Sequence, residues 1–460
     1  MKRTLTVAVC AVMAGAVVSV AQEPPKAFPR PILIIGGTLI DGSGAPPRHN
    51  DGVLIQNGRL RVIGPRALDR APDNARRIDA TGKWILPGLI DGHIHIFQTG
   101  GLDARPDVVP NPQGRAYADV VGEIRRAPQV YLRAYVCSGI TSVVDPGGAM
   151  WEFNLRDARE DDALAPRLAY SGPLLATYDP PALEVGNDDP IWLMKDAEQV
   201  RAMVANLVSH KPDMIKIWFV HRAGDDLASQ AALVRVAVEA AHKVGLRAAV
   251  HATTLQTAAL AVDAGADILV HSVGDRDVDD EFVRKVVARR VIYVPTLIVG
   301  RSYREVRMRE VVFEDFEREC APPATIASFD VLKTLPDAML PRPSQPLPDQ
   351  TPVQQRNLKR LIDAGAIVAA GTDAGNTRTL HGPSLHREFV LMAEAGLTPM
   401  QIIVSATANG AKLMGREKEL GQLRERMLAD VLILDADPLA DIRNTRKISR
   451  VIRGGALYEK

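Results

Sequence analysis

The chain has 460 residues, of which 46% are hydrophobic and 24% charged, and its 56 Lys and Arg balance 55 Asp and Glu to a net charge of +1. These values are those of an ordinary globular protein and exclude a disordered, fibrous or disulfide-dense chain. The near-neutral charge and the aromatic content of 5% give no support to a nucleic-acid partner. The length allows one large α/β barrel with an accessory domain.

The first 21 residues have the pattern of a secretory signal peptide. Lys2 and Arg3 precede an uncharged run over residues 5–20, and Ser19-Val20-Ala21 is a small-x-small cleavage site. This run is shorter than the ~20 apolar residues that span a bilayer. We therefore predict a secreted or periplasmic protein without a membrane segment after cleavage. Cys137 and Cys320 remain, and we expect them to be unpaired because two distant cysteines do not establish a disulfide.

Both ends of the remaining chain have the sequence pattern of short β strands. Residues 30–83 contain apolar runs separated by turns, including an Asn57-Gly58 hairpin turn. Residues 417–460 show the same pattern, with apolar runs at 429–435 and 448–455. We predict that the two segments together form one small β-sandwich domain.

Between these ends, residues 84–416 alternate short apolar runs with helix-like stretches. The apolar runs lie at 85–91, 139–144, 167–173, 213–219, 247–251, 267–271, 291–298 and 366–371. Such alternation predicts a parallel sheet with helices on both faces, and eight units in about 300 residues fit a (β/α)₈ TIM barrel. An open doubly wound sheet is the alternative, but the glycine-rich phosphate loop that normally follows its first strand is absent. The proline-rich stretch 300–352 breaks the alternation, and we predict a lid-like insertion over the barrel mouth there.

Two histidines and a lysine occupy strand positions that favour a metal site. His93 and His95 follow the first run and are two residues apart, so they face the same side of an extended strand. Lys216 alternates with Met214 and Trp218 on one face of the fourth run. Burial of a lysine favours its neutral amine, which can add carbon dioxide to form a carbamate that bridges two metal ions. An ion pair or a snorkelling side chain is the alternative for Lys216.

Three further polar residues end later runs. His251 ends the fifth run, His271 the sixth, and Asp373 follows the eighth after Gly371. A barrel brings these strand ends to one rim, and histidine with carboxylate suits Zn²⁺ and similar divalent ions. His221, His381 and His386 lie near predicted mouth loops, where they could contact substrate or serve as surface or capping residues. We place His221 and His381 among the candidate substrate-binding residues.

The whole set resembles the amidohydrolase superfamily. The matching segments are 87–95, the Lys216 strand, His251, His271, 139–145, 371–375 and the tail 429–439. Within the superfamily the chain resembles the imidazolonepropionase-like branch, which includes secreted metal-dependent dipeptidases and carboxypeptidases. The resemblance implies a distorted (β/α)₈ barrel, a β-sandwich made from both ends of the chain, and two divalent metal ions, commonly zinc.

The resemblance also implies how the metal ions are shared. One metal would take His93, His95, Asp373 and carboxylated Lys216, and the other would take Lys216, His251 and His271. A metal-bridging hydroxide would attack the carbonyl of a small amide, dipeptide or acyl-amino acid, with Asp373 as general base and then acid. Two other possibilities remain: a one-metal hydrolase of a cyclic amide, and a non-catalytic metal-binding barrel.

Several segments depart from the branch while the metal set is complete. Val144 stands where an arginine is frequent, and Ser171-Gly172-Pro173-Leu174-Leu175 lacks a glycine-glycine-histidine segment that is common in the peptidases. These departures bear on peptide specificity. The actual substrate, the metal identity and the oligomeric state are not specified by these residues.

Overall fold

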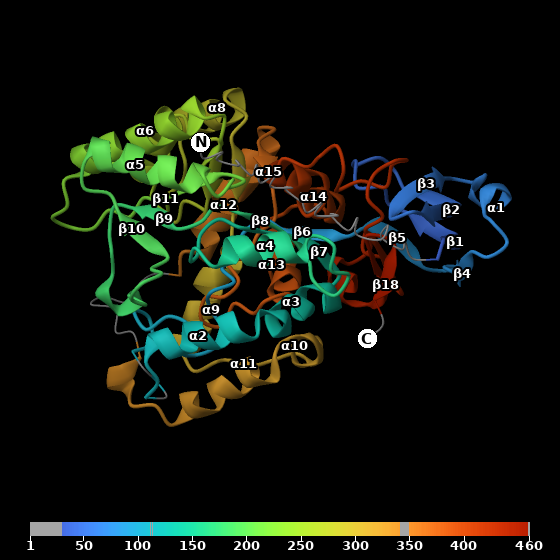
Figure 1. Ribbon diagram of the computed structural model, residues 1–460, viewed down its shortest axis with the longest axis horizontal. Helices are drawn as coiled ribbons and strands as arrows, with labels where there is room; N and C mark the ends of the chain where they lie inside the picture. The colour runs from blue at the N-terminus through green and yellow to red at the C-terminus, as the bar shows by residue number, and fades with distance from the viewer. Residues whose placement is uncertain (1–29, 111, 113, 341–348, 459–460) are drawn as a thin grey trace, which may run out of the picture.

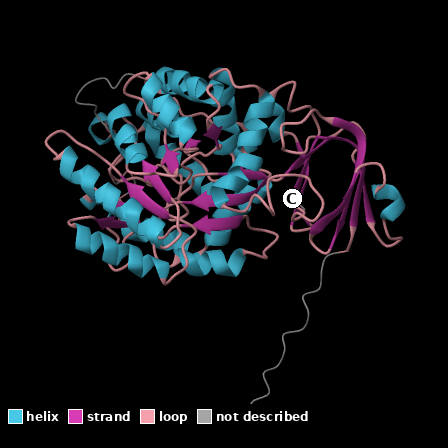
Figure 2. Ribbon diagram, turned by 90° about the horizontal axis from the view of Figure 1, so that it is seen from above, coloured by secondary structure: helices cyan, strands magenta, loops and turns pink. Residues whose placement is uncertain are grey.

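The computed structural model describes residues 30–110, 112, 114–340 and 349–458. The predicted signal peptide, residues 1–21, lies outside the described residues. Figure 1 shows a sheet domain at one end of the molecule, next to a larger α/β domain. In Figure 2 the strands of the larger domain are surrounded by helices. Within the described residues, no helix is both long and apolar enough to cross a membrane.

The sheet domain consists of strands from both ends of the chain, as predicted. Its eight strands hydrogen-bond into one sheet in the order β18-β17-β16-β5-β1-β2-β3, with β4 also paired to β1. The strands are β1 (Ile32–Leu39), β2 (Arg48–Gln56), β3 (Arg59–Ile63), β4 (Arg76–Asp79), β5 (Trp84–Pro87), β16 (Val431–Leu434), β17 (Ile448–Arg453) and β18 (Ala456–Tyr458), and the short helix α1 (Ala67–Arg70) packs on β1 and β2.

Strand β16 joins the cores of the two domains because its side chains alternate. Val431 and Ile433 are fully buried in the core of the sheet domain, with Ile34 and Val53 from the other end of the chain. Leu432 on the opposite face, like Leu434, packs in the large core of the barrel. The period-two alternation of a strand therefore allows one apolar run to hold both domains together.

The larger domain contains the predicted distorted barrel. The eight barrel strands are β6 (Leu89–Asp91), β7 (Ile140–Asp145), β8 (Arg167–Tyr170), β11 (Ile215–Trp218), β12 (Ala248–His251), β13 (Ile268–Val270), β14 (Ile292–Val294) and β15 (Ile367–Val368). They form two parallel sheets, β6-β7-β8 and β10-β9-β11-β12-β13-β14-β15. Gly92 N donates to Ala370 O (2.8 Å) and Asp213 N to Tyr170 O (2.9 Å), which connect the two sheets at both seams. The extra strands β9 (Leu174–Ala176) and β10 (Ile191–Leu193) lie between β8 and β11 in the chain, with the short turn η1 (Pro181–Leu183) joining them.

Helices alternate with the barrel strands along the chain. They are α2 (Tyr117–Arg126), α3 (Pro128–Cys137), α4 (Glu152–Arg159), α5 (Ala197–Val208), α6 (Leu227–Lys243), α7 (Leu255–Asp263), α8 (Asp280–Ala288), α9 (Leu297–Arg307), α12 (Thr351–Asp363), α13 (Ser384–Glu394), α14 (Pro399–Ser405) and α15 (Ala408–Met414). The Asp226 carboxylate caps the start of α6 by accepting from Ala228 N and Ser229 N. Gly245 follows the end of α6 with φ +76°, a conformation that favours glycine.

The boundary between the domains differs from the predicted one. The sequence predicts that the apolar run 85–91 forms the first barrel strand, but β5 pairs with β1 and β16 of the sheet domain, and only β6 belongs to the barrel. The chain passes from one sheet to the other at Gly88, where an added Cβ would lie 2.2 Å from Thr141 Oγ1. Periodicity cannot show this division because both halves of the run are buried and apolar.

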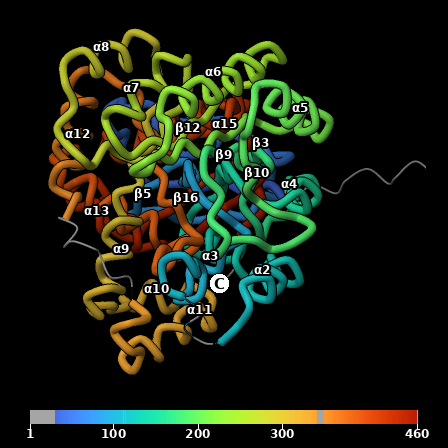
Figure 3. Tube along the Cα trace, turned by 90° about the vertical axis from the view of Figure 1, so that its left-hand side faces the viewer, coloured from blue at the N-terminus to red at the C-terminus, as the bar shows by residue number. Residues whose placement is uncertain are grey.

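The stretch 300–352 is largely helical where it is described. It contains most of α9, then α10 (Asp315–Cys320), α11 (Pro323–Ala327) and the turns η2 (Ser328–Lys333) and η3 (Asp337–Met339). In Figure 3 α9, α10 and α11 gather below the barrel strands, on the side opposite α6 and α8. Residues 341–348 lie outside the described part, and the proposed movement of this stretch as a lid stays a prediction.

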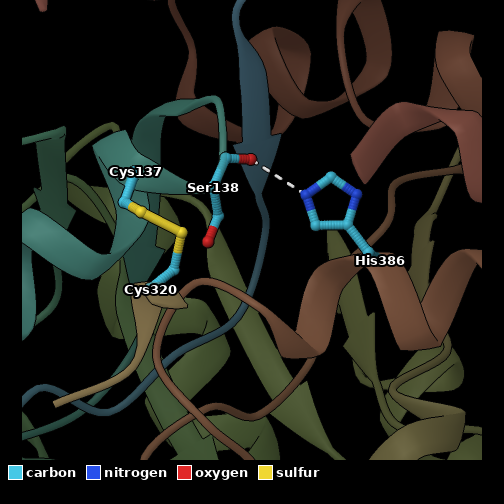
Figure 4. The surroundings of a disulfide bond; sticks show 4 residues. All are labelled: Cys137, Ser138, Cys320 and His386. Carbon is cyan, nitrogen blue, oxygen red and sulfur yellow. Dashed lines mark hydrogen bonds between the residues drawn. A yellow bond between two sulfur atoms is a disulfide. The ribbon is translucent and has the colours of Figure 1, made fainter. Parts of the chain in front are cut away.

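The expectation that Cys137 and Cys320 are unpaired is wrong. Their sulfur atoms form a disulfide, with the Cα atoms 5.5 Å apart across a sequence separation of 183 residues (Figure 4). The bond joins the end of α3 to the end of α10, and these two helices pack against each other. Sequence could not show the pairing because it depends on how the helical segment after α9 folds back onto α3.

Candidate active site

The ends of β6 and β15 bring two histidines and an aspartate together. His93 Nε2 lies 3.2 Å from His95 Nε2, and Asp373 Oδ1 lies 3.5 Å and 3.2 Å from these two nitrogens. All three residues are buried, and their ligand atoms lie within 4.8 Å of one another. His95 Nδ1 lies 2.6 Å from Gly147 O, which can only accept, so Nδ1 carries the proton and donates. The Nε2 lone pair of His95 is therefore available to a metal ion when the ring is neutral.

The other predicted ligands lie on the neighbouring strands. The ring centres of His251 and His271 are 4.3 Å apart, and His271 is 5.0 Å from His93. His271 Nδ1 pairs with Thr296 Oγ1 at 2.7 Å. Lys216 is only 1% exposed and faces the same cavity as His251 and His271. The structure therefore brings all six predicted metal ligands together.

The pKa values of these groups reflect burial next to like and unlike charges. Burial lowers the pKa of Lys216 to about 7, against the effect of Asp373 and Asp145, which raise it. Burial also lowers the pKa of His271 to about 3, and burial and His271 hold that of His251 well below its usual value. These shifts favour neutral lysine and imidazole groups, which are the forms that react with carbon dioxide or ligate metals.

His95 and Asp373 are the charged pair of the site. Burial lowers the pKa of His95, but hydrogen bonds to the Asp145 and Asp373 carboxylates outweigh it and raise this pKa to about 9. Burial raises the pKa of Asp373, while His93 and His95 together hold it well below its usual range. A bound metal cation would take the place of the proton on His95 and would keep Asp373 ionised. The donor set therefore fits a divalent metal ion.

Two of these residues have a strained backbone that hydrogen bonds to neighbouring strands hold in place. His271 and Asp373 have φ values of +78° and +64°, in the left-handed region that non-glycine residues rarely adopt. Asp373 N donates to His93 O (2.7 Å) and His271 N to Val294 O (2.8 Å), so neighbouring strands hold the strained conformation. Gly371 lets the chain approach, because an added Cβ would lie 2.9 Å from His93 N and 2.6 Å from Val294 Cγ1.

A cavity of about 280 Å³ opens next to the six residues. Its polar wall includes Arg105, Tyr303 and Gln98, and its apolar wall includes Leu174, Leu183, Ile191 and Trp218. Arg105 donates through Nη1 to Asn376 Oδ1 (2.7 Å), and Asn376 Nδ2 donates to Asp373 O (2.9 Å). The Asn376 side chain therefore connects the Arg105 guanidinium group to the backbone of Asp373, the candidate general base.

Two of the predicted substrate-binding histidines do not reach this cavity. His381 is 1% exposed, and its ring nitrogens pair with the Tyr135 hydroxyl (2.7 Å) and Gln98 O (2.6 Å). His221 is exposed on the chain after β11 and pairs with Gln230 Oε1. Neither residue belongs to the cavity wall, so their assignment to substrate binding is corrected.

His386 is also buried outside the site. It pairs with Thr445 Oγ1 and donates to Ser138 O, beside the disulfide, as Figure 4 shows. The prediction that it could touch substrate is therefore wrong. All three histidines were placed by nearness in the chain to expected mouth loops, and that signal does not tell which way a ring points.

Sequence reasoning missed other residues of the site. Asp145 ends β7 directly after an apolar run, as the predicted metal ligands do, and accepts from Ile96 N (2.7 Å) and Gly147 N (3.0 Å) while facing His95. Asp91 accepts from Thr372 N and Oγ1 and so ties β6 to the Asp373 loop. The same strand-end rule could have found both. Arg105 lies in a loop, and no sequence pattern marks it.

The comparisons with known proteins agree with this geometry. The model of the amidohydrolase family matches residues 84–457. An imidazolonepropionase of Salinispora arenicola is 26% identical over 422 residues, covering 87% of this chain and 91% of that protein. An ochratoxinase of Aspergillus niger is 23% identical over 472 residues, covering 93% and 86%. A crystal structure of a Xaa-Pro dipeptidase with bound methionine in its active site superposes with a TM-score of 0.70 at 25% identity, covering 94% of this chain and all of that one.

The chain therefore belongs to the amidohydrolase family. It is a metal-dependent hydrolase that acts on carbon–nitrogen bonds, and the cluster of His93, His95 and Asp373 is its candidate metal site.

Proposed function

We propose that the enzyme is a binuclear zinc amidohydrolase. His93, His95, Asp373 and carboxylated Lys216 would hold one ion, and Lys216, His251 and His271 the other. The observation that carries this proposal is the convergence of all six side chains on one buried cluster beside the cavity. The pair His251–His271 supports a second ion because it lies beside, and not within, the His93–His95–Asp373 cluster. Zinc is supported by the nitrogen and carboxylate ligands.

The chain's own residues would manage the protons and the substrate. Bound metal ions polarise a carbonyl and lower the pKa of water. Asp373 would accept the proton of the attacking water and pass it to the leaving nitrogen. Gly147 O and Asp145 hold the ring of His95, and Thr296 holds that of His271, so neither ring has to reorient when the ligands act.

The cavity supports a small substrate with a carboxylate, such as a dipeptide or an acyl-amino acid. Two Asp107 oxygens accept from Arg105 Nε and Nη2, and Asn376 accepts from Nη1, so three of the five guanidinium N–H groups are used. Two N–H groups remain for a ligand, and both Arg105 and Tyr303 line the cavity. A carboxylate bound there would lie near Asp373, beside the leaving nitrogen.

We further propose that the protein is secreted or periplasmic. The signal-peptide pattern of residues 1–21 supports this location. The Cys137–Cys320 disulfide supports it independently, because disulfides persist in oxidising compartments.

The test combines metal analysis with a matched substrate pair. We expect two zinc ions per chain, and hydrolysis of N-acetyl amino acids in preference to the same amides without the carboxylate. Arg105→Ala should reduce that preference by roughly 10- to 100-fold, as expected for a hydrogen bond to a charged group. Arg126→Ala, on the exposed end of α2, is the control. One ion per chain with hydrolysis of a cyclic amide would favour the mononuclear alternative and overturn the binuclear proposal.

A further inference from the structure

An apolar wall borders the cavity on the side of β9, β10 and β11. It consists of Leu174, Leu183, Ile191 and Trp218, and we refer to these four residues as the apolar wall. Leu174, Leu183 and Ile191 are buried in one small cluster, and Trp218 packs against it. Three of the four come from the segment between β8 and β11, which is also where the sequence departs from the peptidase pattern at 171–175.

Strand register explains why these side chains share one face. Ile191 of β10 is directly paired with Leu174 of β9, so both point the same way. Trp192 and Leu175, the next pair along the two strands, take the other face and pack against the main core. The excursion after β8 therefore extends the barrel sheet and turns an apolar surface toward the cavity.

Trp218 lies one layer beyond Lys216 on β11 and is the direct register partner of His251 on β12. Met214, just before β11, and Lys216 and Trp218 on the strand face the inside of the barrel, while Ile215 and Ile217 pack against the main core. Two residues of strand rise about 6.6 Å, so the indole lies just outside Lys216 on the way to the mouth. Its ring is 6.1 Å from that of His251 in an edge-on arrangement.

The charged group of the cavity is anchored on other strands. Arg105 is held through Asn376 to the Asp373 loop after β15, and Tyr303 of α9 donates to the same Asn376 oxygen (2.7 Å). The apolar wall is built on β9, η1, β10 and β11. A substrate that contacts both therefore has one orientation, with its carboxylate near Asp373 and its apolar group near Lys216 and Trp218.

Resting on the proposed function, we propose that the apolar wall is the acyl subsite and takes an aromatic ring attached to the scissile carbonyl. The preferred substrates are then N-aroyl or arylacyl amino acids with a free carboxylate. Water adds to the carbonyl carbon, a C–O bond forms, the C–N bond breaks, and the amino acid nitrogen takes up the proton. The products are an aromatic carboxylic acid and an amino acid. A cavity of about 280 Å³ is small among ligand pockets, which suits a single ring.

Binding tests this inference separately from turnover. The probes are N-benzoylglycine and N-acetylglycine, titrated by calorimetry into the Asp373→Asn variant, which should bind without hydrolysing and whose zinc content is first matched to that of wild type. We expect the dissociation constant for N-benzoylglycine to be lower by about tenfold or more, because a buried ring gains both area and aromatic packing. Adding Trp218→Ala should bring the two constants within about twofold of each other.

Two further variants distinguish the loss of contacts with the apolar wall from a general disturbance of the structure. Trp192→Ala removes the same residue type from the other face of the same sheet and should keep the tenfold preference. Leu183→Ala, on η1, should reduce the preference without changing zinc content, which covers the case in which Trp218→Ala disturbs Lys216 or His251. Equal binding of the two probes by the parent variant would overturn the inference. So would preferred hydrolysis of N-acetylphenylalanine over N-benzoylglycine, because its ring lies on the leaving side.

The same experiment distinguishes this inference from the proposed function. Hydrolysis of both probes at equal kcat/KM would refute the acyl subsite and leave the hydrolase proposal standing. Trp218-dependent binding of N-benzoylglycine by a zinc-loaded wild-type protein that hydrolyses no acyl-amino acid would support the subsite and refute the proposed reaction.

Discussion

Replacing Lys216 with alanine tests the proposed binuclear centre directly. The side chain is 1% exposed, and burial lowers its pKa from the usual 10.5 to about 7. At pH 8 a lysine with this pKa is about 90% neutral, whereas an ordinary lysine is only about 0.3% neutral. The buried amine is therefore roughly 300-fold more available to carbon dioxide.

We expect wild-type protein loaded with zinc and bicarbonate at pH 8 to hold two ions per chain, as measured by plasma emission. Lys216→Ala should lose at least one ion, and its turnover should fall by about 100-fold or more. Short-chain carboxylic acids should restore part of the activity, because a carboxylate can occupy the space of the carbamate. Lys243→Ala, at the exposed end of α6, should behave as wild type.

The pH dependence of loading has a defined direction. Lowering the pH from 8 to 6 reduces the neutral fraction of Lys216 to about 10%, so carbamate formation should slow by about tenfold. Isotope-labelled bicarbonate would reveal the carbamate carbon by NMR. Two ions per chain with normal turnover in Lys216→Ala would refute the carbamate, as would two bound ions in wild type without a labelled carbamate.

Three other predictions follow from single side chains. Asp373→Asn should lower kcat by about 10²- to 10⁴-fold while most of the fold remains, and full activity would rule out the base assignment. Burial raises the pKa of Glu388 from 4.5 to about 8, against hydrogen bonds from Leu297 N and Ile298 N. The folded state then binds more protons than the unfolded state between these pH values, so stability is highest below 4.5 and falls as pH rises through 8. The resulting loss of unfolding free energy is up to about 5 kcal/mol. Glu388→Gln should remove most of this pH dependence, as measured by urea unfolding at pH 5 and 8.5. Cys320→Ser removes a loop closure of 183 residues and should cost about 5 kcal/mol. Reduced wild type should match that variant, and equal stability of oxidised and reduced protein would contradict this account.

Much of the barrel could be predicted because its signals are local. An aspartate cap and apolar periodicity mark the starts of helices α6 and α8. The strand-end rule brought together six residues from five strands, because parallel strands in a barrel end at one rim. The same rule, applied to Asp145, would have added the residue that faces His95.

Features that depend on how loops return to the barrel could not be predicted. Arg105 and Tyr303 meet at Asn376 although they are far apart in the chain, and neither follows a strand. The sequence predicts His381 at the cavity, but its ring nitrogens form hydrogen bonds with the Tyr135 hydroxyl and Gln98 O in the core. Its loop turns the ring towards Tyr135 and away from the cavity. Loop conformation depends on contacts with distant elements, and these leave no periodic trace in the sequence.

The sequence by itself determined the barrel alternation, the two-ended sheet domain and the set of candidate metal ligands, because strand and helix periods and strand-end polarity are properties of neighbouring residues. The tertiary structure alone decided the division of 84–91 between two sheets, the Cys137–Cys320 disulfide and the cavity with a cation at one wall and Trp218 at another. Each of these depends on which surfaces pack together, and packing is set by the whole chain.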